Sequence, residues 1–190
     1  MGQGKLEFRE NPERVERIIN VWHEWQNAAA RQSSGTSSLS GQPPRVNAEG
    51  QLVLGDESDV MHFLVQGDDC YYIDSQERGS RQRFWMFWQF VDAEKYLLVL
   101  ISQAMRPGPF SASPIFRWYR LGVDPRVTLA KPDPDNFPGR VSLTVDDEPA
   151  PRGWMGETDA ISFSHAIVLT FEELDRELRE GVPSDWFIPL

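Results

Sequence analysis

The sequence predicts an α+β fold: an antiparallel β-sheet meander with an N-terminal helix, a central helix and a C-terminal helix. Three observations support this prediction. Apolar residues recur at three- and four-residue spacing early in the chain, which is typical of an amphipathic helix. From Arg45 onward, short β-rich runs are separated by Gly, Pro and Asp. The regular strand–helix alternation of a parallel sheet is missing, which favours α+β over α/β.

The first predicted helix begins after Asn11–Pro12 and runs to about Arg31. Asn can cap a helix, Pro suits the first helical position, and the acidic Glu13 meets the helix dipole favourably. One apolar stripe follows, made of Val15, Ile18, Ile19, Trp22, Trp25 and Ala29.

Residues 32–44 are rich in Ser and Gly and end in two prolines, which predicts a flexible linker or a long exposed loop. We therefore divide the chain into residues 1–44, a helix plus linker, and residues 45–190, a single α+β domain. One interpretation of this linker is that the first helix is an arm packed loosely on the rest.

Four strands are predicted in the next part of the chain. They are Leu52–Leu54, Val60–Val65, Cys70–Ile73 and Arg83–Phe90. The last run, RFWMFWQF, is apolar on both of its faces, which predicts a central strand covered on both sides. With turns between them, these runs predict an antiparallel meander.

A central helix is predicted from a cap at Asp92 to about Met105, before the helix-breaking Pro107–Pro109. Strands are predicted after it at Arg117–Leu121, Arg126–Ala130, Arg140–Val145 and Ile161–Leu169. Thr170 and Glu173 form the pattern of a capping box, which predicts the start of the last helix.

Composition limits the classes of partner. The 190 residues carry a formal net charge of −10, which repels nucleic-acid phosphates and anionic lipid. Such a charge serves solubility first and would also suit a basic partner. A single cysteine, no secretory signal and no membrane-spanning stretch predict a cytoplasmic protein without nucleic-acid or membrane partners.

Few residues point to chemistry. His23, His62, His165 and Cys70 show no metal-ligand spacing, and no phosphate-binding glycine motif is present. Cys70 lies among carboxylates and is interpreted as a small core residue. We therefore predict no enzyme, and no catalytic, cofactor-binding or metal-binding residues.

A hydrolase is the weakest alternative. Ser164 and His165 are adjacent and carboxylates are plentiful, but no nucleophile-elbow motif is present. A structural histidine is the preferred interpretation of His165. The paired acids fall on turns, where Asp is favoured for backbone contacts.

The second half of the chain resembles a known family. The stretches 92–106, 117–134 and 139–175 are similar to immunity factors that neutralise the tuberculosis necrotizing toxin and related polymorphic toxins. The similarity covers roughly residues 60 to 188 and is most distinctive at Gly122–Leu129 and Arg152–Glu157. The resemblance implies a cytosolic, non-catalytic protein without cofactors. It also implies one-to-one binding to the toxin's NAD-glycohydrolase catalytic domain and occlusion of its NAD-binding cleft.

Three loops are candidates for the contact, because rigid Pro-rich loops with aromatic tips lose little entropy on binding. They are Arg106–Pro114, Lys131–Gly139 and Pro149–Glu157. The candidate toxin-binding residues are Arg106, Phe110, Ser111, Ser113, Lys131, Asp133, Asp135, Phe137, Trp154 and Met155. The alternative for these aromatics is that they fold back onto the core. A non-enzymatic adaptor that binds another protein remains the second functional interpretation.

Overall fold

The computed structural model describes residues 8, 12–31, 41–56, 60–131 and 139–188, and its architecture is α+β as predicted. The described strands form one eight-stranded sheet in the order β1-β2-β3-β4-β5-β8-β7-β6, with neighbours antiparallel. The strands are β1 (Arg45–Val46), β2 (Leu52–Leu54), β3 (Val60–Gln66), β4 (Tyr71–Glu77), β5 (Ser80–Phe87), β6 (Val127–Ala130), β7 (Arg140–Val145) and β8 (Gly153–Gly156). The helices are α2 (Glu13–Ala30), α3 (Phe90–Met105), α4 (Pro114–Leu121), α5 (Glu157–Ile167) and α6 (Phe171–Leu178), with the short 3-10 helices η2 (Phe110–Ala112) and η3 (Ser184–Phe187).

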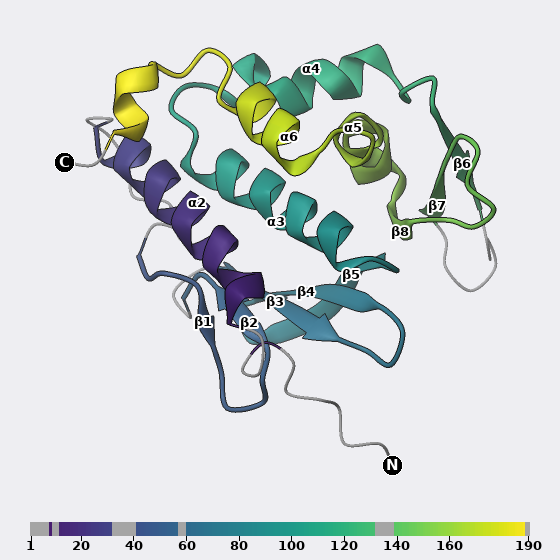
Figure 1. The fold of residues 1–190 in the computed structure, drawn as a ribbon, viewed down its shortest axis with the longest axis horizontal. Coiled ribbons are helices and arrows are strands. Elements are labelled where there is room, and N and C mark those ends of the chain that lie inside the picture. Colours follow the sequence, from purple (N-terminus) through teal and green to yellow (C-terminus); the bar gives the residue numbers. More distant parts are fainter. Residues whose placement is uncertain (1–7, 9–11, 32–40, 57–59, 132–138, 189–190) are drawn as a thin grey trace.

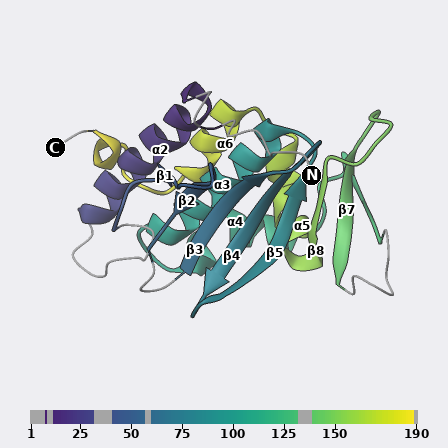
Figure 2. The ribbon, with the colours of Figure 1, turned by 90° about the horizontal axis from the view of Figure 1, so that it is seen from below.

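The helices gather on one side of the sheet, and strands β3 to β5 show their other face in the view from below (Figures 1 and 2). Helix α3 packs directly on the sheet. The ring of Tyr96 lies 5.1 Å from that of Trp85 and 5.6 Å from that of Phe87, measured between centroids. Helix α5 extends this core, since Phe163 contacts both Phe87 and Tyr96 edge-on. The aromatic core therefore lies where α3, α5 and β5 meet.

The sheet consists of two meanders joined at one short seam. Strands β1 to β5 follow one another in sequence, whereas β8, β7 and β6 continue the sheet in reverse order. At the seam, only Met86 pairs with Trp154 and Phe87 with Gly153. A Cβ at Gly153 would lie 2.4 Å from the carbonyl oxygen of Met86, so the two strands can approach only because residue 153 is glycine.

Helix α2 spans nearly the predicted residues, but it is not a loose arm. Its Trp22 and Trp25 are 1% and 0% exposed and belong to the same hydrophobic core as the sheet and α3. Arg17 adds a hydrogen-bonded ion pair to Glu94 of α3, with Nε 2.8 Å from Oε1. The expectation of loose packing was wrong. It rested on the composition of residues 32–44, whereas the apolar stripe of α2 determines how this helix packs.

Two predicted strands are helices. Arg117–Leu121 lies in α4, whose first turn is capped by the Ser113 hydroxyl, an acceptor for the Phe116 amide, with Pro114 in the position that prolines favour. Most of Ile161–Leu169 lies in α5, where Ala160, Phe163 and Ile167 are buried at helical spacing. In both segments, the strand preference of aromatic and β-branched residues is outweighed by one buried helical face. In α4 the Ser113 cap adds to this, whereas α5 has no side-chain cap.

The run RFWMFWQF is not covered on both sides. Strand β5 ends at Phe87, and Phe84 and Trp88 are 40% and 47% exposed on the chain's surface. The residue predicted as a helix cap, Asp92, instead lies in the first turn of α3, which begins at Phe90. The predicted capping box at Thr170 and Glu173 is confirmed, as is the last helix that it begins.

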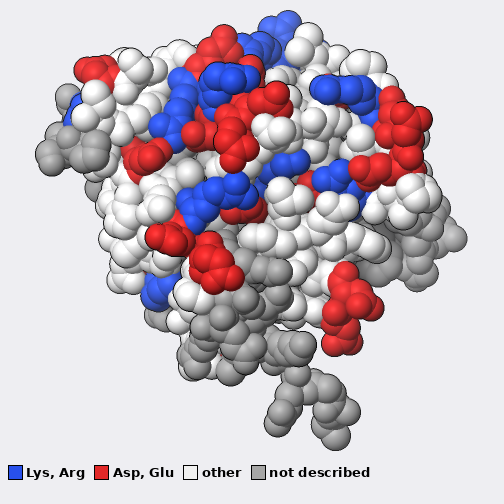
Figure 3. All heavy atoms as spheres, in the orientation of Figure 1, with Lys and Arg blue, Asp and Glu red and all other residues white. Residues whose placement is uncertain are grey.

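Charged residues on the face seen in Figure 3 alternate in sign and do not form a patch of one charge. Opposite charges are also paired inside the molecule. The Arg152 guanidinium binds both oxygens of the buried Asp92, and its third nitrogen binds Glu148. The Lys95 ammonium lies 3.6 Å from Asp92 and donates to the backbone carbonyl of Ile167. This network links α3 to the β7–β8 turn and α5.

Substituting Gly153 tests the seam. We expect Gly153→Ala to lower the free energy of unfolding by about 1–3 kcal/mol, because the added methyl group overpacks the β5–β8 junction. Gly156→Ala is the matched control in the same strand, since its Cβ would meet nothing closer than 3.8 Å. Urea denaturation of both variants measures the difference. Equal stability of the two variants would show that the close approach at position 153 is not a constraint.

His62 of β3 generates a second prediction, on pH. Its side chain is 8% exposed, its Nδ1 has no hydrogen-bond partner among the described residues, and burial lowers its pKa to about 4. The unfolded chain binds this proton near pH 6.5, so folding stability is complete above that pH and falls as pH drops toward 4.

For His62, the expected loss between pH 7 and pH 5 is about 2 kcal/mol. Denaturation at both pH values measures it. His62→Phe should be less sensitive to pH by that amount, whereas substituting the exposed His23 by Gln should keep the wild-type pH dependence. The attribution to His62 fails if both variants lose stability with acid as the wild type does.

Candidate interaction surface

A groove of about 320 Å³ lies between α3, α4 and α5. Its walls are aromatic: Tyr96 comes from α3, Phe110 and Phe116 from the η2–α4 segment, and Phe163 from α5. Tyr119, one turn beyond Phe116 on α4, completes the wall. The polar side chains at its edge are Gln103, Thr158, Ser162 and Asp159. The groove therefore combines an apolar interior with one carboxylate.

Local sequence fixes the outer wall. Helix α3 ends at Met105, and the Arg106 guanidinium donates to the carbonyls of Leu178 and Glu180, which anchors the turn to the end of α6. The Pro107–Pro109 turn then leads into η2, where Phe110 lies edge-on to Phe116 at 5.7 Å. This arrangement leaves Phe110 58% exposed at the edge of the groove.

Exposed apolar side chains concentrate on η2, α4 and the residues just after α4, and two of them, Phe110 and Tyr119, line the groove. Of the seven large hydrophobic residues that are exposed in the described chain, four lie between residues 110 and 123: Phe110, Tyr119, Leu121 and Val123. Large exposed apolar patches on soluble proteins mark binding surfaces more often than chance exposure does. We define the docking surface as these four residues together with the groove between α3, α4 and α5.

Asp159 of α5 lines the groove and is half-buried. Its Oδ2 accepts a hydrogen bond of 2.9 Å from the Trp85 indole, and it interacts with the Tyr96 hydroxyl. Burial raises the pKa of the Asp159 carboxyl, although both donors act in the opposite direction. Burial and the neighbouring carboxylate raise the pKa of Tyr96 well above its usual value. Both shifts show that this corner of the groove is poorly solvated.

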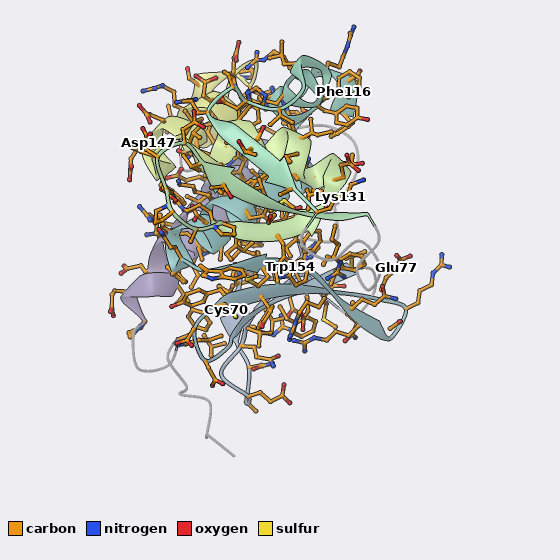
Figure 4. The ribbon with its side chains drawn as sticks, turned by 90° about the vertical axis from the view of Figure 1, so that its right-hand side faces the viewer. Cys70, Glu77, Phe116, Lys131, Asp147 and Trp154 are labelled. Carbon is orange, nitrogen blue, oxygen red and sulfur yellow. The ribbon has the colours of Figure 1, made fainter. Side chains whose placement is uncertain are left out.

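Five of the ten candidate residues are exposed or partly exposed to solvent in the described part of the chain. Phe110 and Ser111 are exposed on η2, and Arg106 is partly buried below them. Lys131 is exposed directly after β6, and Trp154 of β8 is half-buried with the Arg140 guanidinium 4.4 Å above its ring (Figure 4). Three others, Asp133, Asp135 and Phe137, lie outside the described residues.

Two candidates are wrong as contact residues. Met155 is 0% exposed because the predicted third loop is the strand β8, which turns this side chain into the core. Ser113 is 3% exposed because its hydroxyl caps α4. Sequence reasoning also missed Tyr119, Leu121 and Asp159, which become neighbours only because α4 and α5 are helices.

The possible catalytic pair is held in structural contacts. The Ser164 hydroxyl donates to the Ile161 carbonyl at 2.7 Å and accepts from the Asp124 amide at 2.8 Å. The His165 ring stacks on Trp118, and its Nε2 lies 2.8 Å from the Gly122 carbonyl oxygen. Its Nδ1 lies 3.6 Å from the Asp124 carboxylate. These contacts are of the kind expected for a structural histidine, which stays the preferred interpretation.

The other candidates for chemistry were Cys70 and a metal site. Cys70 directly precedes β4 and is half-buried (Figure 4). It is therefore not the small core residue that its type predicted. Among the described residues, no group of three or more His, Cys, Asp or Glu side chains could hold a metal ion. No helix within the described ranges is long and apolar enough to span a bilayer.

Comparison with known proteins gives a fold-level similarity. No family model matches the chain, and no curated protein matches it. Among solved structures, Rv3902c from M. tuberculosis matches with a TM-score of 0.56 and 15% sequence identity. The match covers 82% of this chain and 84% of that chain. At this identity the two proteins share a fold, and nothing further follows from the match alone.

Proposed function

We propose that this protein is an immunity protein that binds the catalytic domain of an NAD-glycohydrolase toxin and blocks its NAD-binding cleft. The observation that carries the proposal is the docking surface: exposed aromatic and aliphatic side chains on a rigid helix beside a groove. Aromatic anchors at the centre of an interface supply most of the binding energy in protein complexes. The proposed protein has no catalytic role and acts in the cytoplasm, where the cell's NAD is at risk.

The resemblance to toxin immunity factors supports this proposal. Its two most distinctive stretches frame the docking surface: Gly122–Leu129 follows α4 directly, and Arg152–Glu157 contains β8 and leads into α5. These stretches therefore flank the surface to which the proposal assigns toxin binding.

The scaffold suits an inhibitor because α4 is fixed before any partner arrives. Trp118 is 5% exposed and stacks on His165, and Arg117 pairs with Glu180 at 2.8 Å. A pre-formed surface spends little free energy on ordering when it binds. The net charge of −10 complements a cleft that must attract the phosphates of a dinucleotide.

An adaptor that binds some other protein is the second candidate. The exposed apolar side chains of the docking surface favour it as well, since they mark protein binding without naming the partner. An assay with a toxin domain separates the two functions.

The test measures NAD hydrolysis by a purified catalytic domain of the necrotizing-toxin class with increasing amounts of this protein. We expect inhibition that is complete at one-to-one stoichiometry. Phe110→Asp should raise the inhibition constant at least about tenfold, because it places a charge in the centre of the interface. Ile188→Asp, which changes another exposed apolar residue, is the control and should inhibit like the wild type. Absence of both a complex and inhibition at micromolar concentration would contradict the proposal.

A further inference from the structure

We propose that the groove between α3, α4 and α5 receives a basic side chain, Arg or Lys, of the toxin, with the Asp159 carboxylate as its counter-ion. This inference rests on the proposed function and adds the chemistry of the contact. Three features of the described residues support it: the lack of a cation at Asp159, the aromatic walls and the acidity of the chain.

Asp159, which is half-buried, differs from the four buried carboxylates of the described chain. Each of those lies within 3.0 Å of an arginine nitrogen: Asp92 with Arg152, Glu94 with Arg17, Asp74 with Arg81 and Arg83, and Asp124 with Arg126. Asp159 instead interacts with two neutral donors, the Trp85 indole and the Tyr96 hydroxyl, and no Lys or Arg of the described ranges pairs with it. A carboxylate removed from water without a cation is unfavourable, so a cation from a partner would gain free energy there.

The electrostatics of Asp159 agree with that geometry. Burial raises the pKa of its carboxyl, and the hydrogen bonds from the Trp85 indole and the Tyr96 hydroxyl offset that rise only in part. An incoming guanidinium or ammonium group would lower this pKa and would replace lost hydration with a direct ion pair. The carboxylate keeps acceptor capacity for a further donor, because its two oxygens offer about four lone-pair sites and the described donors are the Trp85 indole and the Tyr96 hydroxyl.

The walls suit a cation as well as an apolar stem. Basic groups bind over aromatic faces, and long basic side chains pack their methylene stems on apolar surfaces. The chain uses this chemistry internally: five arginines lie over aromatic rings at 3.6–4.4 Å in the described residues. None of those rings belongs to the groove, whose Phe110, Phe116 and Tyr119 are thus open to a cation from outside.

The charges around the groove favour binding of a basic side chain over an acidic one. The chain carries ten more negative than positive charges, which attracts basic surfaces over long range. No Lys or Arg of the described residues lines the groove, and Arg117 of α4 is engaged by Glu180 and Glu177. The volume of about 320 Å³ lies at the lower end of small-molecule sites, which suits one long side chain.

The test uses small probes and the Trp85 indole N–H resonance, which reports on Asp159 because the indole donates to it. Isotope-labelled protein is titrated at constant ionic strength with the N-acetyl methylamides of arginine, lysine and norleucine, to tens of millimolar. We expect the two basic probes to shift this resonance saturably. Norleucine, which has the same stem without the charge, should bind at least about tenfold more weakly.

Variants locate the effect. Asp159→Asn keeps an acceptor for Trp85 but removes the charge, and it should weaken basic-probe binding at least about tenfold. Asp146→Asn removes an equal charge from an exposed turn and should bind the probes like the wild type. Thermal melting confirms that both variants fold. The inference is overturned if norleucine binds as tightly as arginine, if Asp159→Asn binds the basic probes unchanged, or if no probe shifts the resonance.

The toxin assay separates this inference from the proposed function. If the protein inhibits the toxin domain but Asp159→Asn inhibits equally well and the probes do not bind, the cation site is wrong and the function stands. If the basic probes bind and no toxin domain is inhibited, the function is wrong and the chemistry of the groove stands.

Discussion

The structure depends on the buried ion pair between Asp92 and Arg152. Both oxygens of Asp92, which is 0% exposed, accept hydrogen bonds of 2.7 Å from one guanidinium. The pair joins the first turn of α3 to the residue before β8, next to a seam where β5 and β8 share only two residue pairs. Removing one partner of such a pair costs about 3–5 kcal/mol, because it leaves the other charge buried. It therefore holds the start of β8 against α3, and β8 leads directly into α5, which carries Asp159.

This arrangement changes the expected mode of action. The sequence suggested three projecting loops that enter a toxin's cleft. In the structure, the first loop becomes η2 and forms the wall of a groove, and the third is a strand of the sheet. The proposed inhibitor therefore combines a projecting aromatic, Phe110, with a receptive groove behind it. Such a surface could cover the mouth of a cleft and bind a basic residue at its edge at the same time.

Much of the fold was predictable because local signals agreed. The apolar stripe of α2, the capping box of α6 and the predicted strand Arg140–Val145 each specify one structure, and all three are confirmed. Helices α4 and α5 were missed, although Ser113–Pro114 is a strong helix-start signal, because Trp, Tyr, Ile and Val dominate both segments. The docking surface was only partly predictable for the same reason: Phe110 is marked by its loop, whereas Asp159 and Tyr119 become neighbours through tertiary packing alone.

Hydrogen exchange of the complex with an NAD-glycohydrolase toxin domain tests the central claim most directly. The account predicts that toxin binding slows amide exchange in residues 110–123 and 157–163, which form η2, α4 and the first part of α5. Strands β3 and β4, whose outer face carries no described helix, should exchange as in the free protein. Protection confined to β3, β4 and β5, with no change in α4 and α5, would contradict the account.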